Sequence, residues 1–195
     1  MLPDAVQVAD PFHVVKLANS RLDEVRRRVQ NETLGHRGHK NDPLYRSRRL
    51  LTRADERLND RGRKKLLGLL DAGDPHGEVR LAWHAKETVR GLYDHTDPDL
   101  AVDMVQRLGD DLQDESCPPE INQLGRTLIR WRGQIAAWHE AHVSNGPTEA
   151  ANNLIKRVKR IAFGFRRFRN YRIRALLYAG RPNWDLLATI TPTPP

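Results

Sequence analysis

Residues 119–141 read PEINQLGRTLIRWRGQIAAWHEA, and this stretch decides the fold class. A helix that packs against other helices shows large apolar side chains at alternating steps of three and four residues along one face. Aromatic residues at this spacing are typical of a core rather than of cofactor contacts. The stretch therefore predicts one helix inside a mainly α-helical protein. Its apolar positions are Ile121, Leu124, Leu128, Trp131, Ile135 and Trp138.

Helical patterns extend from this stretch towards the N-terminus. Asp97 and Pro98 are a typical N-cap and first-turn proline, so a helix is expected to follow them. Residues 32–47 are rich in Gly, His, Asn and Asp and predict a loop. One face of a first helix carries Val14, Ala18, Leu22, Val25 and Val29. Further helices are expected over 47–58, 61–72, 79–93 and 98–112.

The first residues show a different pattern. Residues 5–9, Ala-Val-Gln-Val-Ala, alternate apolar and polar side chains as a β-strand does, and Asp10 and Pro11 end the pattern. A single strand cannot form a sheet, so its partner strands are expected elsewhere. The pattern indicates that Met1 is not the start of a domain.

The composition favours a polyanionic partner. The chain has 195 residues and a formal net charge of +8, with 38% hydrophobic residues, which is enough for a core. This basic excess indicates nucleic acid first and an anionic membrane surface second, and a solvated basic surface is the alternative. Cys117 is the only cysteine, which excludes an intrachain disulfide and favours a reducing cytoplasm. Neither a bilayer-spanning apolar run nor a signal-peptide layout occurs, so a soluble protein without membrane partners is expected.

A helix with a polar stripe is expected after the turn residues 144–147, Ser-Asn-Gly-Pro. Its apolar side carries Leu154, Ile155, Val158 and Ile161, and Glu149 falls on the opposite side. Near Glu149 are Asn152 and Asn153, and Lys156 and Arg160 continue the stripe. A carboxylate beside carboxamides, followed by cations, suits a site where a metal ion meets a phosphate backbone. The alternative is that Glu149 only complements the helix dipole.

An arginine-rich segment follows this helix. Residues 163–165, Phe-Gly-Phe, are expected to break the helix, and every charged residue from Lys156 to Arg181 is basic. Arginines interleaved with Phe168 and Tyr171 suit phosphate contact and base stacking. The alternative is a basic amphipathic helix that packs its aromatic side chains inward, and the two interpretations can hold together. The predicted DNA-binding residues are Lys156, Arg160, Arg166, Arg167, Arg169, Arg172 and Arg174.

These residues resemble the C-terminal signature of bacterial insertion-sequence transposases of the DDE class, which have an RNase H-like catalytic domain. The matching residues are 144–149, Asn153, Lys156, Lys159, Arg160, 163–165, Phe168, 170–172 and Arg174. Residues 10–13, Asp-Pro-Phe-His, resemble the Asp-Xaa-Xaa-His element that follows a late sheet strand in related transposases. The resemblance implies a fold that is mainly α: the C-terminal part of an RNase H-like α/β core with an all-helical insertion.

The resemblance also divides the chain. Residues 1–13 are expected to end the RNase H-like sheet, and residues 14–140 to form the helical insertion. Residues 141–181 are expected to hold the glutamate helix and the basic segment, and residues 182–195 a tail. The implied partners are transposon-end and target DNA, with a homo-oligomer in the intact enzyme, and the implied location is the cytoplasm at the nucleoid.

The chemistry of the family uses two aspartates and one glutamate to hold two divalent metal ions, Mg²⁺ or Mn²⁺. The family's glutamate maps onto Glu149. The first aspartate belongs on an early strand, and no such strand precedes Asp10. The second is expected one strand upstream, and Asp10 itself is the alternative. We therefore expect a truncated transposase that is inactive alone, or a reading-frame remnant. The rival interpretation is a basic helical protein that binds nucleic acid without catalysis.

Two other candidate sites have weaker support in the sequence. His36 and His39 have the residue type and spacing of metal ligands, but the sequence around them is a Gly-rich basic loop without a second ligand pair. Cys117 lacks the neighbours of a catalytic nucleophile. No Gly-rich phosphate-binding loop is present.

Overall fold

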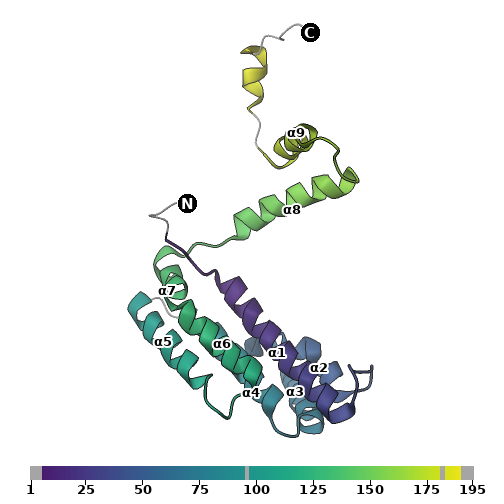
Figure 1. Cartoon of the computed structure of the whole chain (residues 1–195), viewed down its shortest axis with the longest axis vertical. Coiled ribbons are helices and arrows are strands. Elements are labelled where there is room, and N and C mark those ends of the chain that lie inside the picture. Colours follow the sequence, from purple (N-terminus) through teal and green to yellow (C-terminus); the bar gives the residue numbers. More distant parts are fainter. Residues whose placement is uncertain (1–5, 95–96, 181–182, 190–195) are drawn as a thin grey trace. The chain divides into compact units, whose positions relative to one another are not determined.

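A computed structural model describes residues 6–94, 97–180 and 183–189 of the chain. Within these residues all regular elements are helices, as Figure 1 shows. They form two compact units, residues 1–143 and 144–195. None of the described helices is both long enough and apolar enough to cross a membrane.

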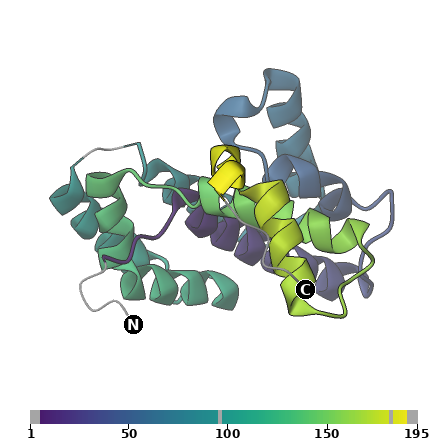
Figure 2. The same ribbon diagram turned by 90° about the horizontal axis from the view of Figure 1, so that it is seen from above.

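The first unit is an assembly of helices around α1 (Pro11–Leu34). The other elements are α2 (Pro43–Leu51), the 3₁₀ turn η1 (Asp55–Arg57), α3 (Asp60–Gly73), α4 (Glu78–Gly91), α5 (Pro98–Asp111), α6 (Pro119–Arg130) and α7 (Arg132–Ala141). Helix α1 packs against α2, α4 and α6, while α5 packs against both α6 and α7. Helices α2 and α3 pack against each other (Figure 2).

The sequence accounts well for α1. The Asp10 carboxylate accepts a hydrogen bond from the Phe12 N–H at 2.7 Å, and Pro11 stands in the first turn. The helix ends at Gly35, where a φ of 70° favours glycine. The predicted apolar face is confirmed, because it is buried in the core: Val14, Ala18, Leu22, Val25 and Val29.

The strand expected over residues 5–9 does not form in the described part of the chain. Residues 6–10 have no regular structure, and Ala5 lies outside the described residues. The Ala9 N–H donates to the Gln134 carbonyl of α7 at 2.8 Å. This single hydrogen bond cannot be extended into a β-sheet ladder, because the other backbone carbonyls of a helix accept hydrogen bonds within their own helix.

The helix boundaries between residues 32 and 58 differ from the predicted ones. Helix α1 continues to Leu34 and α2 begins at Pro43, so the loop is shorter than expected. Asp42 and Pro43 repeat the N-cap and proline pattern that opens α5, and α2 ends at Leu51 before a separate 3₁₀ turn. The pattern at α5 is confirmed: the Asp97 carboxylate accepts hydrogen bonds from the N–H groups of Asp99 and Leu100 at 3.0 and 3.2 Å.

The single helix expected over 119–141 is two helices that meet at Trp131. The backbone of Trp131 has φ −98° and ψ 9°, outside the helical range, and its N–H contacts the carbonyls of both Thr127 and Leu128. The predicted apolar seam is nevertheless largely buried, with Ile121, Leu124, Leu128 and Ile135 in the core. Side-chain periodicity reports the buried face and is insensitive to one residue of altered backbone.

Two basic residues link the helices of this unit. The guanidinium of Arg28 in α1 contacts Glu78 of α4 at 2.5 Å and Glu120 of α6 at 2.8 Å. Lys86 of α4 is fully buried, and its ammonium donates to the carbonyls of Leu51 and Arg53 at 2.9 and 2.8 Å. These contacts tie α1 to α4 and α6, and α4 to the end of α2.

Candidate catalytic helix and nucleic-acid interface

Glu149 stands in the first turn of α8 (Gly146–Ile161), in the second unit. The turn before the helix forms as expected, with the Ser144 hydroxyl accepting a hydrogen bond from the Gly146 N–H at 3.0 Å. Pro147 follows in the first turn, where its missing N–H leaves no intrahelical bond unmade. The Glu149 N–H donates to the Asn145 carbonyl at 2.8 Å, which fixes the residue at the helix start.

The two faces of α8 are arranged as the sequence predicts. Val158 is buried, and Leu154 and Ile155 beside it are half-buried, whereas Ile161 at the helix end is exposed. The polar stripe advances by about one turn at each step and is exposed throughout: Glu149, Asn153, Lys156 and Arg160. The packing of α8 thus uses the side away from Glu149.

The helix ends where residues 163–165 were expected to break it. Phe163 and Gly164 both have positive φ, 51° and 103°, and the Gly164 N–H donates to the Lys159 carbonyl at 3.2 Å. Only glycine adopts this backbone at little cost, and Phe163 bears the strain next to it. The turn leads to α9 (Phe168–Ala179), which packs against α8.

The predicted DNA-binding arginines are all exposed in this helical hairpin. Arg166 and Arg167 lie in the connection before α9, and Arg169, Arg172 and Arg174 lie on α9 itself. The aromatic residues divide between two roles. The rings of Phe165 and Tyr171 are half-buried and lie 5.2 Å apart, whereas Phe168 is 75% exposed and available for stacking.

A family model of DDE transposases of the ISL3 type, described as "Transposase", matches residues 1–175. The chain belongs to this transposase family. The match spans both units and includes the whole of α8 and most of α9. The family suggested by the glutamate helix and the arginine-rich segment is therefore confirmed.

Known relatives agree with this assignment. The transposases for insertion sequence element IS1557 from two strains of Mycobacterium tuberculosis are each 31% identical over 191 residues. That alignment covers 84% of this chain and 40% of those proteins, so the chain matches less than half of their length. An ATP-dependent protease of Lactococcus lactis is 42% identical over 55 residues, which is 28% of this chain. No solved structure matches the chain significantly.

Asp10, the alternative second carboxylate of the transposase, lies in the first unit. It is 8% exposed and one of its oxygens caps α1. Burial raises the pKa of Tyr93, and the negative charge of Asp10 raises it further, which places Asp10 near that ring. Capping and burial give Asp10 a structural role, and its Asp-Pro pair has the same pattern as the cap at Asp97 and Pro98.

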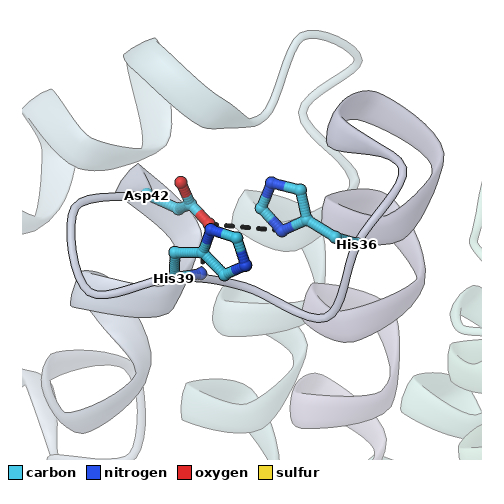
Figure 3. A group of neighbouring side chains, drawn as sticks. All are labelled: His36, His39 and Asp42. Carbon is cyan, nitrogen blue, oxygen red and sulfur yellow. Dashed lines mark hydrogen bonds and ion pairs between the residues drawn. The ribbon is translucent and has the colours of Figure 1, made fainter.

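The structure treats the two remaining candidate sites, Cys117 and the histidine pair, differently. The Cys117 thiol is half-buried beside Asp114, and both burial and this charge raise its pKa, which disfavours a nucleophilic thiolate. His36 and His39 are joined by Asp42, and the three side chains are close enough to share one metal ion (Figure 3). Sequence reasoning missed Asp42, although its spacing of three residues from His39 repeats the spacing of the two histidines.

Proposed function

We propose that this chain provides the glutamate-bearing part of a DDE transposase that cleaves and joins DNA, with Glu149 as a ligand of a catalytic metal ion. The exposed stripe of α8 carries the proposal, because Glu149 precedes Lys156 and Arg160 on it. A carboxylate binds a cation and basic side chains bind phosphates, so the stripe suits a metal ion at a DNA backbone. The opposite side of α8 makes the packing contacts, and Glu149 lies on the exposed side.

The divalent ion implied by the family, Mg²⁺ or Mn²⁺, fits Glu149 as one ligand. The neighbouring Asn152 and Asn153 are exposed and offer amide oxygens, which such hard cations accept. When bound, a pair of these ions activates the attacking oxygen and stabilises the leaving oxygen. A pair needs several carboxylates, whereas α8 supplies one and Asp10 caps α1. Glu149 is the one carboxylate of α8, so this helix fits one ligand position of such a centre.

DNA contact by the arginine-rich segment is the second part of the proposal. Its arginines are exposed on both the connection and α9, beside the exposed ring of Phe168. Arginine binds phosphate oxygens bidentately and an exposed ring stacks on bases. We assign the DNA-binding role to Lys156, Arg160, Arg166, Arg167, Arg169, Arg172 and Arg174.

The helical residues 14–140 are proposed to be an insertion in an RNase H-like catalytic domain. An insertion is tolerated best when its two ends lie close together. Ala9, just before α1, is bonded to Gln134 of α7, and Tyr93 near Asp10 stacks on His139 of α7 at 5.9 Å. On this proposal residues 1–13 lead out of the catalytic sheet, residues 141–181 hold the glutamate helix and basic segment, and residues 182–195 form a tail.

Substitution of Glu149 in a full-length transposase with this sequence as its C-terminal part tests the proposal. Glu149→Gln keeps the shape of the side chain and removes the charge, so DNA binding and folding should persist while cleavage falls by several orders of magnitude. Glu140→Gln, also an exposed glutamate, is the matched control and should cleave normally. If Glu149 only complements the helix dipole, the variant loses a few tenths of a kcal/mol of stability and keeps its activity.

A non-catalytic function in nucleic-acid binding is the rival supported by the exposed arginines. On that interpretation, DNA binding by this chain would need no metal ion, and a full-length protein with intact Glu149 would not cleave transposon ends. Cleavage by the full-length protein that depends on Glu149 therefore excludes the rival.

A further inference from the structure

The loop between α1 and α2 brings two imidazoles and a carboxylate together, as Figure 3 shows. The donor atoms of His36, His39 and Asp42 all lie within 4.8 Å of one another. Among the described residues this is the one group of three or more such side chains close enough to hold a metal ion. We propose that His36, His39 and Asp42 bind a divalent transition-metal ion such as Zn²⁺. This site goes beyond the proposed function and does not depend on it.

The donor types favour a late transition metal over Mg²⁺ or Ca²⁺. Imidazole nitrogen suits Zn²⁺, Co²⁺ and Ni²⁺, whereas Mg²⁺ and Ca²⁺ prefer oxygen ligands alone. Two donors on one tetrahedral Zn²⁺ lie about 3.3 Å apart, because each bond is about 2.0 Å long. The Nδ1 of His36 lies 3.6 Å from the Asp42 carboxylate, close to this separation. It also accepts a hydrogen bond from the Gly38 N–H at 3.1 Å, and a metal ion at Nδ1 would replace this bond.

The backbone of the loop is held at both ends. Gly35 closes α1 with its N–H on the Asn31 carbonyl at 2.9 Å, and the Asp42 carbonyl accepts from the Arg46 N–H of α2 at 3.0 Å. In the middle, Gly38 has φ 107° and lies so close to the buried Gln30 that any side chain there would collide with it. A loop fixed in this way presents its side chains with little ordering cost on binding.

The Asp42 carboxylate faces the histidines instead of capping its helix. Asp42 is the N-cap residue of α2, where a carboxylate usually accepts from a helix N–H, yet it makes no such bond. Its oxygen accepts from the His39 backbone N–H and faces the His36 ring. The His36 and His39 rings stack with centroids 4.1 Å apart, which gathers all three donors on one side of the loop (Figure 3).

The site is open to solvent and sits among positive charges. His39 is exposed and His36 and Asp42 are half-buried, so water can complete the coordination shell. Arg37 and Lys40 in the same loop are exposed and oppose a cation, but solvent and salt screen exposed charges. An ion bound here would join the end of α1 to the start of α2 and stabilise that junction.

Calorimetric titration of the full chain with Zn²⁺, in excess Mg²⁺, tests the proposal. One Zn²⁺ per chain is expected, together with a rise in melting temperature on binding. His39→Ala and Asp42→Asn should each weaken binding by at least about tenfold, because each removes one of three ligands. Asp42 makes no side-chain capping bond, and Asn keeps an oxygen that can accept from the His39 N–H, so Asp42→Asn should leave the metal-free melting temperature nearly unchanged.

His76→Ala is the matched control, since His76 is exposed and lies outside the loop. It should bind Zn²⁺ as the unmodified chain does. Co²⁺ gives a second readout, because nitrogen coordination in a four-coordinate site produces visible absorption that His39→Ala should abolish. The proposal would be overturned if the Zn²⁺ affinity were unchanged in both His39→Ala and Asp42→Asn. It would also be overturned if His76→Ala weakened Zn²⁺ binding as much as those two variants do.

Discussion

Charged side chains serve opposite purposes in the two units. Glu149 is exposed on a stripe of α8 that lies opposite the side packed against α9. Lys86 is fully buried, and its ammonium donates to the Leu51 and Arg53 carbonyls and pairs with Glu87. A cation at the end of α2 complements the helix dipole and bonds carbonyls that have no partner within the helix.

Replacement of Lys86 by methionine is predicted to destabilise the first unit by about 3 kcal/mol. Methionine fills a similar volume, but it leaves the buried carbonyls and the Glu87 carboxylate without their donor. Chemical denaturation of the chain, followed by circular dichroism, measures the effect. Lys64→Met on the exposed face of α3 removes the same charge and should change stability by less than about 0.5 kcal/mol. Equal losses in the two variants would contradict the role given to Lys86.

The contribution of Lys86 should also depend on pH. Burial lowers the pKa of Lys86 below its ordinary value of 10.5, and contact with Glu87 offsets this only in part. Just below pH 10.5 the unfolded chain therefore binds more protons than the folded chain, so stability contributed by Lys86 rises with pH in that range. The stability difference between the unmodified chain and Lys86→Met is expected to widen there, and a difference that narrows would contradict this sign.

Single residues show how far sequence reasoning reaches. The exposure of Glu149 follows from its angular position on a helix, which needs only neighbouring residues. Lys86 lies at helical spacing with Val79, Trp83 and Val89, so the local pattern places it on the buried face although lysine is normally exposed. The approach of Asp42 to His36 depends on how the loop folds back, which periodicity does not show. Asp10 is a candidate ligand by pattern, and in the structure one of its oxygens also caps α1.

The basic hairpin of α8 and α9 carries a prediction of its own. Salt should weaken DNA binding by this chain on the order of tenfold or more between about 50 and 200 mM, because several phosphate contacts release counterions. Replacing Arg166, Arg167 and Arg169 together with alanine should flatten that slope in a fluorescence anisotropy titration. The three positions are exposed, so folding should persist.

The control removes the same charge from the first unit. Arg61, Lys64 and Lys65 of α3 are exposed as well, and alanine at all three should leave the salt slope nearly unchanged. If both triple variants flatten the slope equally, net charge rather than the arginine-rich segment determines binding.

Elements with a strong local signal matched their predictions. The apolar face of α1, the cap of α5 and the turn after α8 each depend on residues adjacent along the chain or around one helix. The strand over residues 5–9 failed because alternation describes a strand only where a partner strand pairs with it, and Ala9 bonds to a helix instead. The bend at Trp131 was missed because the side chains keep their period through it.

The two units differ in how much apolar surface they bury. The first has a core of leucines and valines drawn from α1 to α7. In the hairpin of α8 and α9, Ile161, Leu176 and Leu177 are 65%, 57% and 52% exposed. Burial within such a hairpin alone stabilises it little, which agrees with the proposal that this segment completes a larger catalytic domain. The family resemblance supplied that larger context, which periodicity within the chain does not contain.

The chain alone is predicted neither to cleave nor to join DNA. The proposed centre needs three carboxylates around two metal ions, whereas α8 provides one and the chain matches 40% of the length of the IS1557 transposases. Purified chain incubated with transposon-end DNA and Mg²⁺ or Mn²⁺ should give no nicked product. A full-length transposase with the same C-terminal sequence is the positive control. Metal-dependent nicking by the chain that disappears in Glu149→Gln would contradict this prediction. It would show that a second and a third ligand lie within these residues, with Asp10 as the first candidate.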